Sequence, residues 1–406
     1  MNNRNDNYYD YDYDYRENGY GYRTHKRKYT WAHQLKRLFW FLLIPLGLLI
    51  PRICVRYPET IEMVYSRKIY PVIAAVLSSI SSVVRSSLAE VLIIIIILIF
   101  AVNLLVRLCV MVFGKLHKRS YHRIRLVSSL ISFVIFVGVM LNLFYMLWGL
   151  NNFRELVAYS LELEVRQYSV DELAAVYEKL ASEAAELRTQ VNEDDNGVFT
   201  IGSPNKAYAA VEEAYMNLGE ANGLFKNAAF GRVNLHTAKS VKLSEQMSQF
   251  GTLGIYIPYT AEINVNVDQP DLYIPATAAH ETAHFLGFAR EDEANFIAFY
   301  VSRFSTDTAL RYSAVMNALV NCGNALCQED SQRFLALRDK LYTDGMNRDL
   351  NEYRNYLAKY DDGAMQQLND DINDAYLKHN GQQEGIQSYG RMVDILLAYY
   401  DRIDEI

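Results

Sequence analysis

The chain has 406 residues, long enough for two or three structural units, and a net charge of −7. The first 150 residues hold 19 Lys and Arg against 8 Asp and Glu, whereas the remainder holds 21 against 39. This asymmetry argues against a nucleic-acid-binding protein, and basic residues beside apolar runs favour a membrane protein with a separate water-soluble domain.

Residues 1–30 form a low-complexity stretch rich in Tyr, Asp, Asn and Gly. Without an aliphatic pattern such a segment cannot build a core, so we predict a disordered tail.

Three apolar runs follow, at about 36–51, 88–113 and 126–150, and we predict a transmembrane helix for each. The first run is short for a span and resembles the core of a secretory signal in length. We favour a retained span, because a long leader precedes the run and no small-residue cleavage site is clear. The predicted membrane domain therefore covers residues 31–150.

The loop between the second and third runs, "GKLHKRSYHRIR", holds five Lys and Arg in 12 residues, which predicts a cytoplasmic loop. A cytoplasmic N-terminus and three spans then place residues 151–406 outside the cytoplasm. The outer loop, 52–87, has apolar residues at roughly helical spacing, and we expect interfacial helices there.

Residues 151–406 are predicted to form a mainly helical domain with a small β-sheet, an α+β fold. The segment "EINVNV" at 262–267 alternates polar and apolar residues, and Pro258 precedes it, so we predict an edge strand. Glu262, Asn264 and Asn266 share one face of this strand. They would either line a substrate cleft or form an ordinary solvated face.

The stretch "PATAAHETAHFLG" contains His280-Glu281-x-x-His284. Ala-rich sequence favours a helix, and Gly287 favours its end. On a helix the two His side chains lie one turn apart on one face, where both can bind one metal ion. Glu281 is then placed to take a proton from a metal-bound water, which is the chemistry of peptide hydrolysis.

The third ligand of such a site has to come from elsewhere, and the acidic run after Gly287 offers candidates. We prefer Glu291, with Glu293 as the alternative, on a helix that begins near "REDEAN". Asn295 lies one turn beyond Glu291, and its amide oxygen could accept a hydrogen bond from a ligand imidazole. An acidic helix start favoured by the helix dipole would look the same without any metal.

Two further features are ambiguous from sequence. Tyr389 and Arg391 lie in a Gly-broken segment near the C-terminus, and either side chain could stabilise an oxyanion, or the segment could simply connect two helices. Cys322 and Cys327 could form a disulfide in an extracytoplasmic domain, or be two small buried residues of a helix.

The motifs as a set resemble a bacterial membrane family catalogued as domain of unknown function 3810. The resemblance rests on "HETAHFLGFAREDEANFIAFY" at 280–300, "YPETIEMVYSRKIYPVI" at 57–73, "GIYIPYTAEINVNVD" at 254–268, "RYS" at 311–313 and "YLKHNGQQEGIQSYGRMVD" at 376–394. It covers about residues 38–400. Members of this family are regarded as gluzincin-like zinc peptidases.

The resemblance implies zinc binding by His280 and His284, a base role for Glu281, and a carboxylate ligand within "REDEAN". "ExxAN" is similar to the "ExxAD" of other gluzincin-type peptidases, which again points to Glu291, with Asn295 in place of Asp.

From residues and resemblance together we expect a multi-pass membrane zinc peptidase that cleaves an unidentified peptide or protein substrate outside the cytoplasm and binds no nucleic acid. The alternative is a non-catalytic membrane receptor or structural protein whose metal site stabilises its fold.

Overall fold

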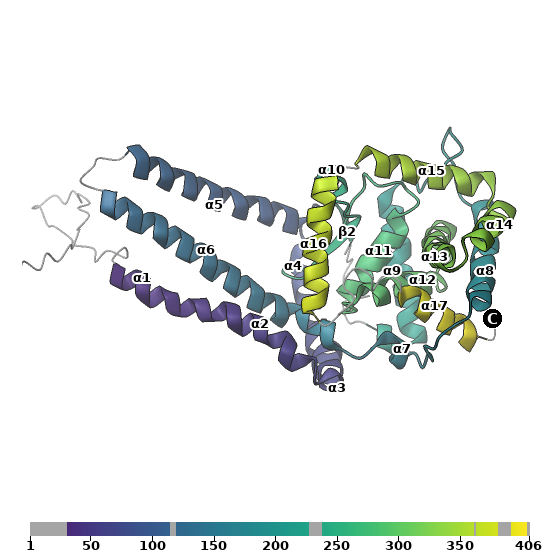
Figure 1. The fold of residues 1–406 in the computed structure, drawn as a ribbon, viewed down its shortest axis with the longest axis horizontal. Helices are drawn as coiled ribbons and strands as arrows, with labels where there is room; N and C mark the ends of the chain where they lie inside the picture. The colour runs from purple at the N-terminus through teal and green to yellow at the C-terminus, as the bar shows by residue number, and fades with distance from the viewer. Residues whose placement is uncertain (1–30, 114–118, 227–237, 361–362, 381–390, 404–406) are drawn as a thin grey trace, which may run out of the picture. The chain divides into compact units, whose positions relative to one another are not determined.

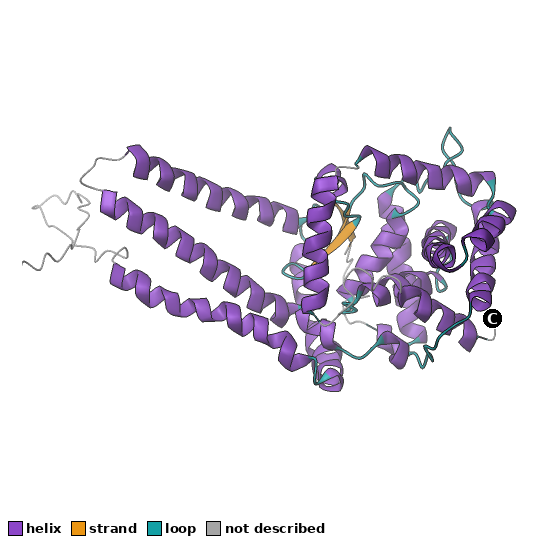
Figure 2. Cartoon of the chain, in the orientation of Figure 1, coloured by secondary structure: helices purple, strands orange, loops and turns teal. Residues whose placement is uncertain are grey.

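A computed structural model describes residues 31–113, 119–226, 238–360, 363–380 and 391–403. The predicted tail, residues 1–30, lies outside this part. The described chain is mostly helical with one three-stranded sheet, as expected (Figures 1 and 2). Its internal contacts define two compact units. The first comprises residues up to 50 together with 91–145, and the second comprises 51–90 and 146–406.

Three helical stretches are long and apolar enough to cross a membrane, namely Trp31–Cys54, Leu88–Cys109 and Arg123–Leu147. They are built from α1 (Trp31–Arg37), η1 (Leu38–Leu42) and α2 (Leu43–Cys54), from α5 (Leu88–Phe113), and from α6 (Arg119–Leu147). The first stretch has 24 residues, because polar residues before the apolar run extend the helix. With this length the first stretch, whose apolar run alone is short for a span, is long enough to cross a membrane.

Within the first unit, α2 and α6 approach closely. A Cβ atom at Gly138 would lie 3.0 Å from Cβ of Leu43. The side-chain amide of Asn142 donates to the Leu43 carbonyl oxygen at 2.7 Å. Small residues and buried amides are the usual means by which membrane helices associate.

The second unit contains the remaining elements. They are α3 (Pro58–Thr60), the π-helix η2 (Ile61–Ile69), α4 (Tyr70–Ser81), η4 (Gly149–Phe153), α7 (Val157–Ser160), α8 (Val170–Arg188), α9 (Pro204–Ala221), η5 (Gly223–Phe225), β1 (Ala238–Ser240), α10 (Ser244–Gln249), β2 (Gly254–Ile257), β3 (Glu262–Val265), α11 (Ile274–Phe285), α12 (Glu291–Ser302), α13 (Thr308–Glu329), α14 (Ser331–Leu341), α15 (Asp344–Lys359), α16 (Gly363–His379) and α17 (Arg391–Arg402).

The segment 52–87 is helical as predicted, but its assignment to the membrane domain needs correction. It packs with the second unit. Glu62 and Arg154 form a buried ion pair with N···O distances of 2.7 and 2.8 Å, and Ser66 Oγ donates to Asn151 Oδ1 at 2.8 Å. Polar groups on this helical segment find their partners in the later chain, so the segment is part of the second unit's core.

The prediction of an edge strand at 262–267 is wrong. The strand order is β1–β3–β2, so β3 is central, parallel to β1 and antiparallel to β2. Pro258 lies in the turn between β2 and β3, where its missing N–H costs no ladder hydrogen bond. The edge strands are β1 and β2, each of which pairs only with β3 among the strands of the described chain.

Helix α11 is the central element of the second unit. It packs against α9, α12, α13, β2 and β3, and every residue of it except His280 is buried. Four Ala side chains let these neighbours approach closely. Large aromatic residues fill the surrounding core: Tyr177, Tyr215, Phe285, Phe288, Phe296, Phe299 and Tyr312.

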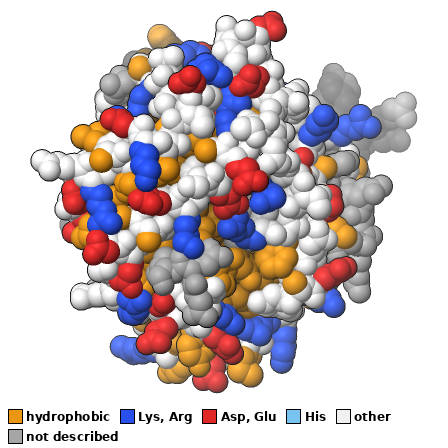
Figure 3. All heavy atoms as spheres, turned by 90° about the vertical axis from the view of Figure 1, so that its right-hand side faces the viewer, with side chains coloured by type: hydrophobic (Ala, Val, Ile, Leu, Met, Phe, Trp, Pro, Cys, Tyr) orange, Lys and Arg blue, Asp and Glu red, His pale blue; other side chains and the backbone are white. Residues whose placement is uncertain are grey.

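The outer surface of the second unit contrasts with this core. Figure 3 shows a face on which acidic and basic side chains are interspersed, the pattern of a water-exposed surface. Cys322 and Cys327 both lie on α13 as free thiols, the first buried and the second exposed. Five residues apart on one helix, they point in different directions, so they form no disulfide.

Candidate metal centre

His280 and His284 lie one turn apart on α11, as the spacing predicts, with ring centroids 4.7 Å apart. Pro275 in the first turn favours the helix start. After the helix, Gly287 adopts a φ of +89°, and a Cβ there would lie 3.0 Å from the Tyr70 ring. A glycine is therefore required at this turn, which directs the chain back across the His-bearing face.

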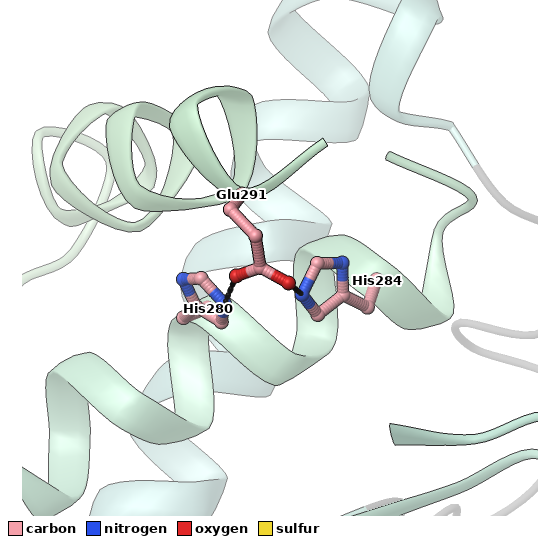
Figure 4. A group of neighbouring side chains, drawn as sticks. All are labelled: His280, His284 and Glu291. Atoms are coloured by element: carbon pink, nitrogen blue, oxygen red, sulfur yellow. Dashed lines mark ion pairs between the residues drawn. The ribbon is translucent and has the colours of Figure 1, made fainter. Parts of the chain in front are cut away.

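The returning chain brings Glu291, the first residue of α12, between the two imidazoles (Figure 4). Its Oε2 atom lies 3.2 Å from His280 Nε2, and its Oε1 atom lies 3.5 Å from His284 Nε2. One ligand atom from each of the three residues lies within 4.8 Å of the others. Among described residues this is the one such cluster of His, Cys, Asp or Glu.

The other ring nitrogens of the two His side chains are fixed by acceptors. His280 Nδ1 lies 2.9 Å from Asn295 Oδ1, and His284 Nδ1 lies 2.7 Å from the Phe288 carbonyl oxygen. Amide and carbonyl oxygens only accept, so each Nδ1 carries a proton. When the rings are neutral, each Nε2 therefore directs its lone pair at the shared space, the arrangement typical of metal-binding histidines.

The electrostatics of the cluster favour a cation. Burial raises the pKa of Glu291, but the nearby His284 and His280 outweigh it and hold that pKa well below its usual range. Burial lowers the pKa of His284, but the Glu291 carboxylate outweighs it and raises the pKa to about 9. A buried carboxylate beside two imidazoles therefore stabilises positive charge at this point.

Glu281 is almost fully buried, at 5% exposure, and burial raises its pKa. Its carboxylate accepts a hydrogen bond from the backbone N–H of Tyr256 on β2. A Cβ atom at Gly254 would lie only 2.8 Å from Glu281 Oε1. The edge strand β2 thus lies directly against this carboxylate, and Gly254 provides the space. Sequence reasoning did not single out Gly254, although a Gly inside a short β pattern signals close approach.

Glu293, the alternative third ligand, is directed elsewhere. Its Oε1 atom accepts from the backbone N–H of Val157 at 2.8 Å and from Arg290 Nη1 at 3.2 Å. The geometry therefore selects Glu291 for the cluster.

The expectation that Glu262, Asn264 and Asn266 line a cleft is wrong, because all three are buried. Glu262 accepts from the backbone N–H groups of Leu88 and Ala89 at 2.9 and 2.7 Å and pairs with Lys239. The Asn264 amide donates to the Glu262 carbonyl oxygen at 3.2 Å, and the Asn266 amide donates to Ser248 Oγ at 2.9 Å. These partners, from the start of α5, from β1 and from α10, account for the burial of the three side chains.

Of the two residues suggested to stabilise an oxyanion, Tyr389 lies outside the described residues. Arg391, the first residue of α17, has its Nε atom 3.4 Å from Asp292 Oδ2. This contact joins α17 to α12 and does not bring Arg391 into the His280, His284 and Glu291 cluster.

Two aromatic residues that the sequence argument did not single out support the end of α11. Trp148 Nε1 donates to the His284 carbonyl oxygen at 2.8 Å, and its ring meets the imidazole edge-on. The Tyr70 hydroxyl donates to the Phe285 carbonyl oxygen at 2.7 Å and lies 3.1 Å from the Tyr256 hydroxyl. In the sequence, Trp148 could have been noticed because it is an aromatic residue with a polar N–H group near the end of the third apolar run.

Comparison with known proteins gives one family match. The model of the family described as Protein of unknown function (DUF3810) matches residues 65–397, more than four-fifths of the chain. The match begins later than the expected residue 38 and includes both the helical segment around Tyr70 and the cluster of His280, His284 and Glu291. No curated protein and no solved structure matches the chain. The chain therefore belongs to the DUF3810 family of proteins of unknown function.

Proposed function

We propose that the chain is a membrane-anchored, zinc-dependent peptidase of the gluzincin type that hydrolyses peptide bonds on the extracytoplasmic side. One observation carries the proposal. Glu291 on α12 completes a three-residue cluster with His280 and His284, and Glu281 lies one residue from the first of these His residues on the same helix.

The donor set fits zinc. Ligands about 2.0–2.1 Å from a tetrahedral zinc ion lie roughly 3.3 Å from one another. The two Nε2-to-carboxylate distances, 3.2 and 3.5 Å, match that spacing. Two imidazoles and one carboxylate leave a fourth position for water or substrate, as in catalytic zinc sites. Zinc held there would polarise a water molecule and a substrate carbonyl.

Glu281 would act as the general base. Its burial favours the uncharged form, so its carboxylate readily accepts a proton from an attacking water. The Tyr256 N–H fixes one face of the carboxylate. Glu281 would then pass the proton to the leaving amine.

The free edge of β2 would hold the substrate. Tyr256 donates its N–H to Glu281 and not to β3, so the edge of β2 that pairs with no strand of the described chain faces the base. An extended peptide adding to this edge by main-chain hydrogen bonds would lie beside the metal cluster. The edge strand beside the cluster is therefore Gly254–Ile257 and not the segment 262–267 predicted from the sequence.

The alternative, a non-catalytic protein with a stabilising metal site, makes an opposite prediction for Glu281→Gln. The material for the test is the full chain, because residues 51–90 belong to the unit that holds the cluster. We expect roughly one zinc per chain in both the wild type and Glu281→Gln. Only the wild type should cleave a fluorogenic peptide library. Full cleavage by the variant, or no stoichiometric metal in the wild type, would contradict the proposal.

A further inference from the structure

Helix α4 has an unusual distribution of polar and apolar residues. Its inward face carries Tyr70, Ala74, Ser78 and Ser81, all buried. Exposed aliphatic residues on its outward face and just beyond its two ends form a stripe, which we call the α4 stripe: Ile69, Val72, Val76, Ile80 and Val83. Small and hydroxylated residues thus face the protein while branched apolar residues face out. This is the reverse of a helix exposed to water.

The α4 stripe lies in a segment that joins two candidate membrane helices, which end at Cys54 and begin at Leu88. If both cross the bilayer, the segment between them has both ends at the same surface. Its exposed charges are mainly basic, namely Arg56, Arg67, Lys68 and Arg85 against Glu59. Basic residues beside an apolar helix face are the pattern of a helix lying in a lipid interface.

Residues next to the candidate spans also contact the site itself. Trp148 follows the last residue of the third span, Leu147, and donates to the carbonyl oxygen of the ligand His284. With three crossings, the end of the first span, the start of the second and the end of the third share one surface of the bilayer.

The distance from the α4 stripe to the cluster is short. Tyr70, on the opposite face of α4, contacts the carbonyl oxygen of Phe285, the residue after His284. One helix diameter, about 10–12 Å, therefore separates the stripe from the end of α11. We propose that the candidate metal centre lies at the level of the lipid headgroups, and that its substrate is the extended juxtamembrane segment of another membrane-anchored protein.

This substrate assignment rests on the proposed peptidase function, whereas the placement does not. A site one helix above the apolar stripe reaches only chain close to the bilayer. The free edge of β2 takes an extended strand, and a juxtamembrane linker can adopt that conformation. A folded domain far from the membrane has no extended segment at the level of the lipid headgroups.

The placement is tested by spin labels on the full chain in phosphatidylethanolamine–phosphatidylglycerol vesicles. The four native cysteines are replaced by Ala, and a label is attached at Val76→Cys or, as control, at Asp195→Cys in an exposed turn. We expect the label at position 76 to collide more often with oxygen, which dissolves in lipid, than with a water-soluble nickel chelate. The label at position 195 should show the reverse. Equal nickel access at both positions would overturn the placement. Exclusion of both agents at position 76 would also overturn it, because a second copy of the chain would then cover the stripe.

A second measurement places the residue that touches His284. In a Trp31→Phe, Trp40→Phe variant, Trp148 is the one remaining tryptophan. We expect bromolipids labelled near the headgroup to quench its fluorescence more than lipids labelled near the chain end. Stronger quenching by the lipids labelled near the chain end contradicts the placement.

The substrate class is tested with palmitoylated fluorogenic peptides in the same vesicles, with the scissile library joined to the anchor by a spacer. A spacer of about 5 residues reaches at most roughly 17 Å, whereas about 30 Gly and Ser residues reach much further. We expect the short-spacer peptides to be cleaved at least as fast as the long-spacer ones. Cleavage that requires the long spacer overturns the assignment. Failure to cleave any peptide, soluble ones included, contradicts the peptidase function, while the placement is still decided by the spin label.

Discussion

The Oε2 atom of Glu291 lies 3.2 Å from Nε2 of His280, although the two residues belong to different helices. The contact exists because Gly287 turns the chain and Phe288 fixes His284 through its carbonyl oxygen. Glu291→Gln keeps the shape but removes the charge. We expect it to lose stoichiometric metal, which elemental analysis of the purified full chain measures.

Glu293→Gln is the matched control for that loss. Because Glu293 contacts Val157 and Arg290 and not the imidazoles, its variant should keep the metal even where stability falls. Metal loss in the Glu293 variant with retention in the Glu291 variant would reverse the ligand assignment.

Asn295 orients His280 through its side-chain oxygen. We expect Asn295→Ala to weaken metal affinity by about 10–100-fold, the usual cost of losing a hydrogen bond to a ligand imidazole. Asn295→Asp, which keeps an acceptor at that point, should recover most of the affinity. Competition with a chromophoric zinc chelator measures both, and equal affinities for all three proteins would contradict the role.

Gly254 makes room for Glu281. A Cβ atom there would lie 2.7 Å from Thr277 Cγ2 and 2.8 Å from Glu281 Cγ, so we expect Gly254→Ala to displace the carboxylate. The overpacking should cost about 1–3 kcal/mol and reduce peptide cleavage more than metal content. Gly223→Ala, where nothing lies within 4 Å, is the control for an added methyl group. Unchanged cleavage by Gly254→Ala would argue against close packing of β2 on Glu281.

The buried pair of Glu62 and Arg154 predicts a pH effect on stability. Burial raises the pKa of Glu62, but the Arg154 and Arg67 guanidinium groups outweigh it and hold that pKa below its ordinary value. A lowered folded-state pKa contributes stability at neutral pH that is lost as the pH falls through that value. We expect the wild-type melting temperature to fall on acidification below about pH 4.5, the ordinary pKa of the carboxyl.

Glu62→Gln separates this effect from general acid unfolding. It leaves Arg154 buried without its charged partner, so it should cost about 3–5 kcal/mol at pH 7. The melting temperature of the variant should then fall less steeply than that of the wild type on acidification. Parallel falls in the two proteins would show that Glu62 does not contribute.

Residue 195 tests the predicted orientation of the second unit. In a chain without its native cysteines, Asp195→Cys lies in an exposed turn after α8. We expect an impermeant thiol reagent to label it in intact cells, because the Lys- and Arg-rich loop before the third span predicts that residues 151–406 are extracytoplasmic. Labelling only after lysis would place the unit in the cytoplasm.

Local patterns in the sequence were sufficient for the helical elements and for two of the three residues of the cluster. Apolar length gives the three candidate spans, and the spacing of His280 and His284 gives their shared helix face, because both depend only on neighbouring residues. The end of α11 near Gly287 could also be predicted from neighbouring residues, because a glycine favours the end of a helix.

The tertiary structure decided everything that depends on residues distant in the chain. The central position of β3 depends on β1, and the choice of Glu291 over Glu293 depends on where Val157 and Arg290 lie. The sequence by itself determined that two imidazoles share one face of a helix, since helical periodicity is fixed by the backbone. The surroundings of the two imidazoles were decided by the tertiary structure, in which segment 51–90 and Trp148 pack near the end of α11. Burial and long-range hydrogen bonds cannot be predicted from neighbouring residues alone.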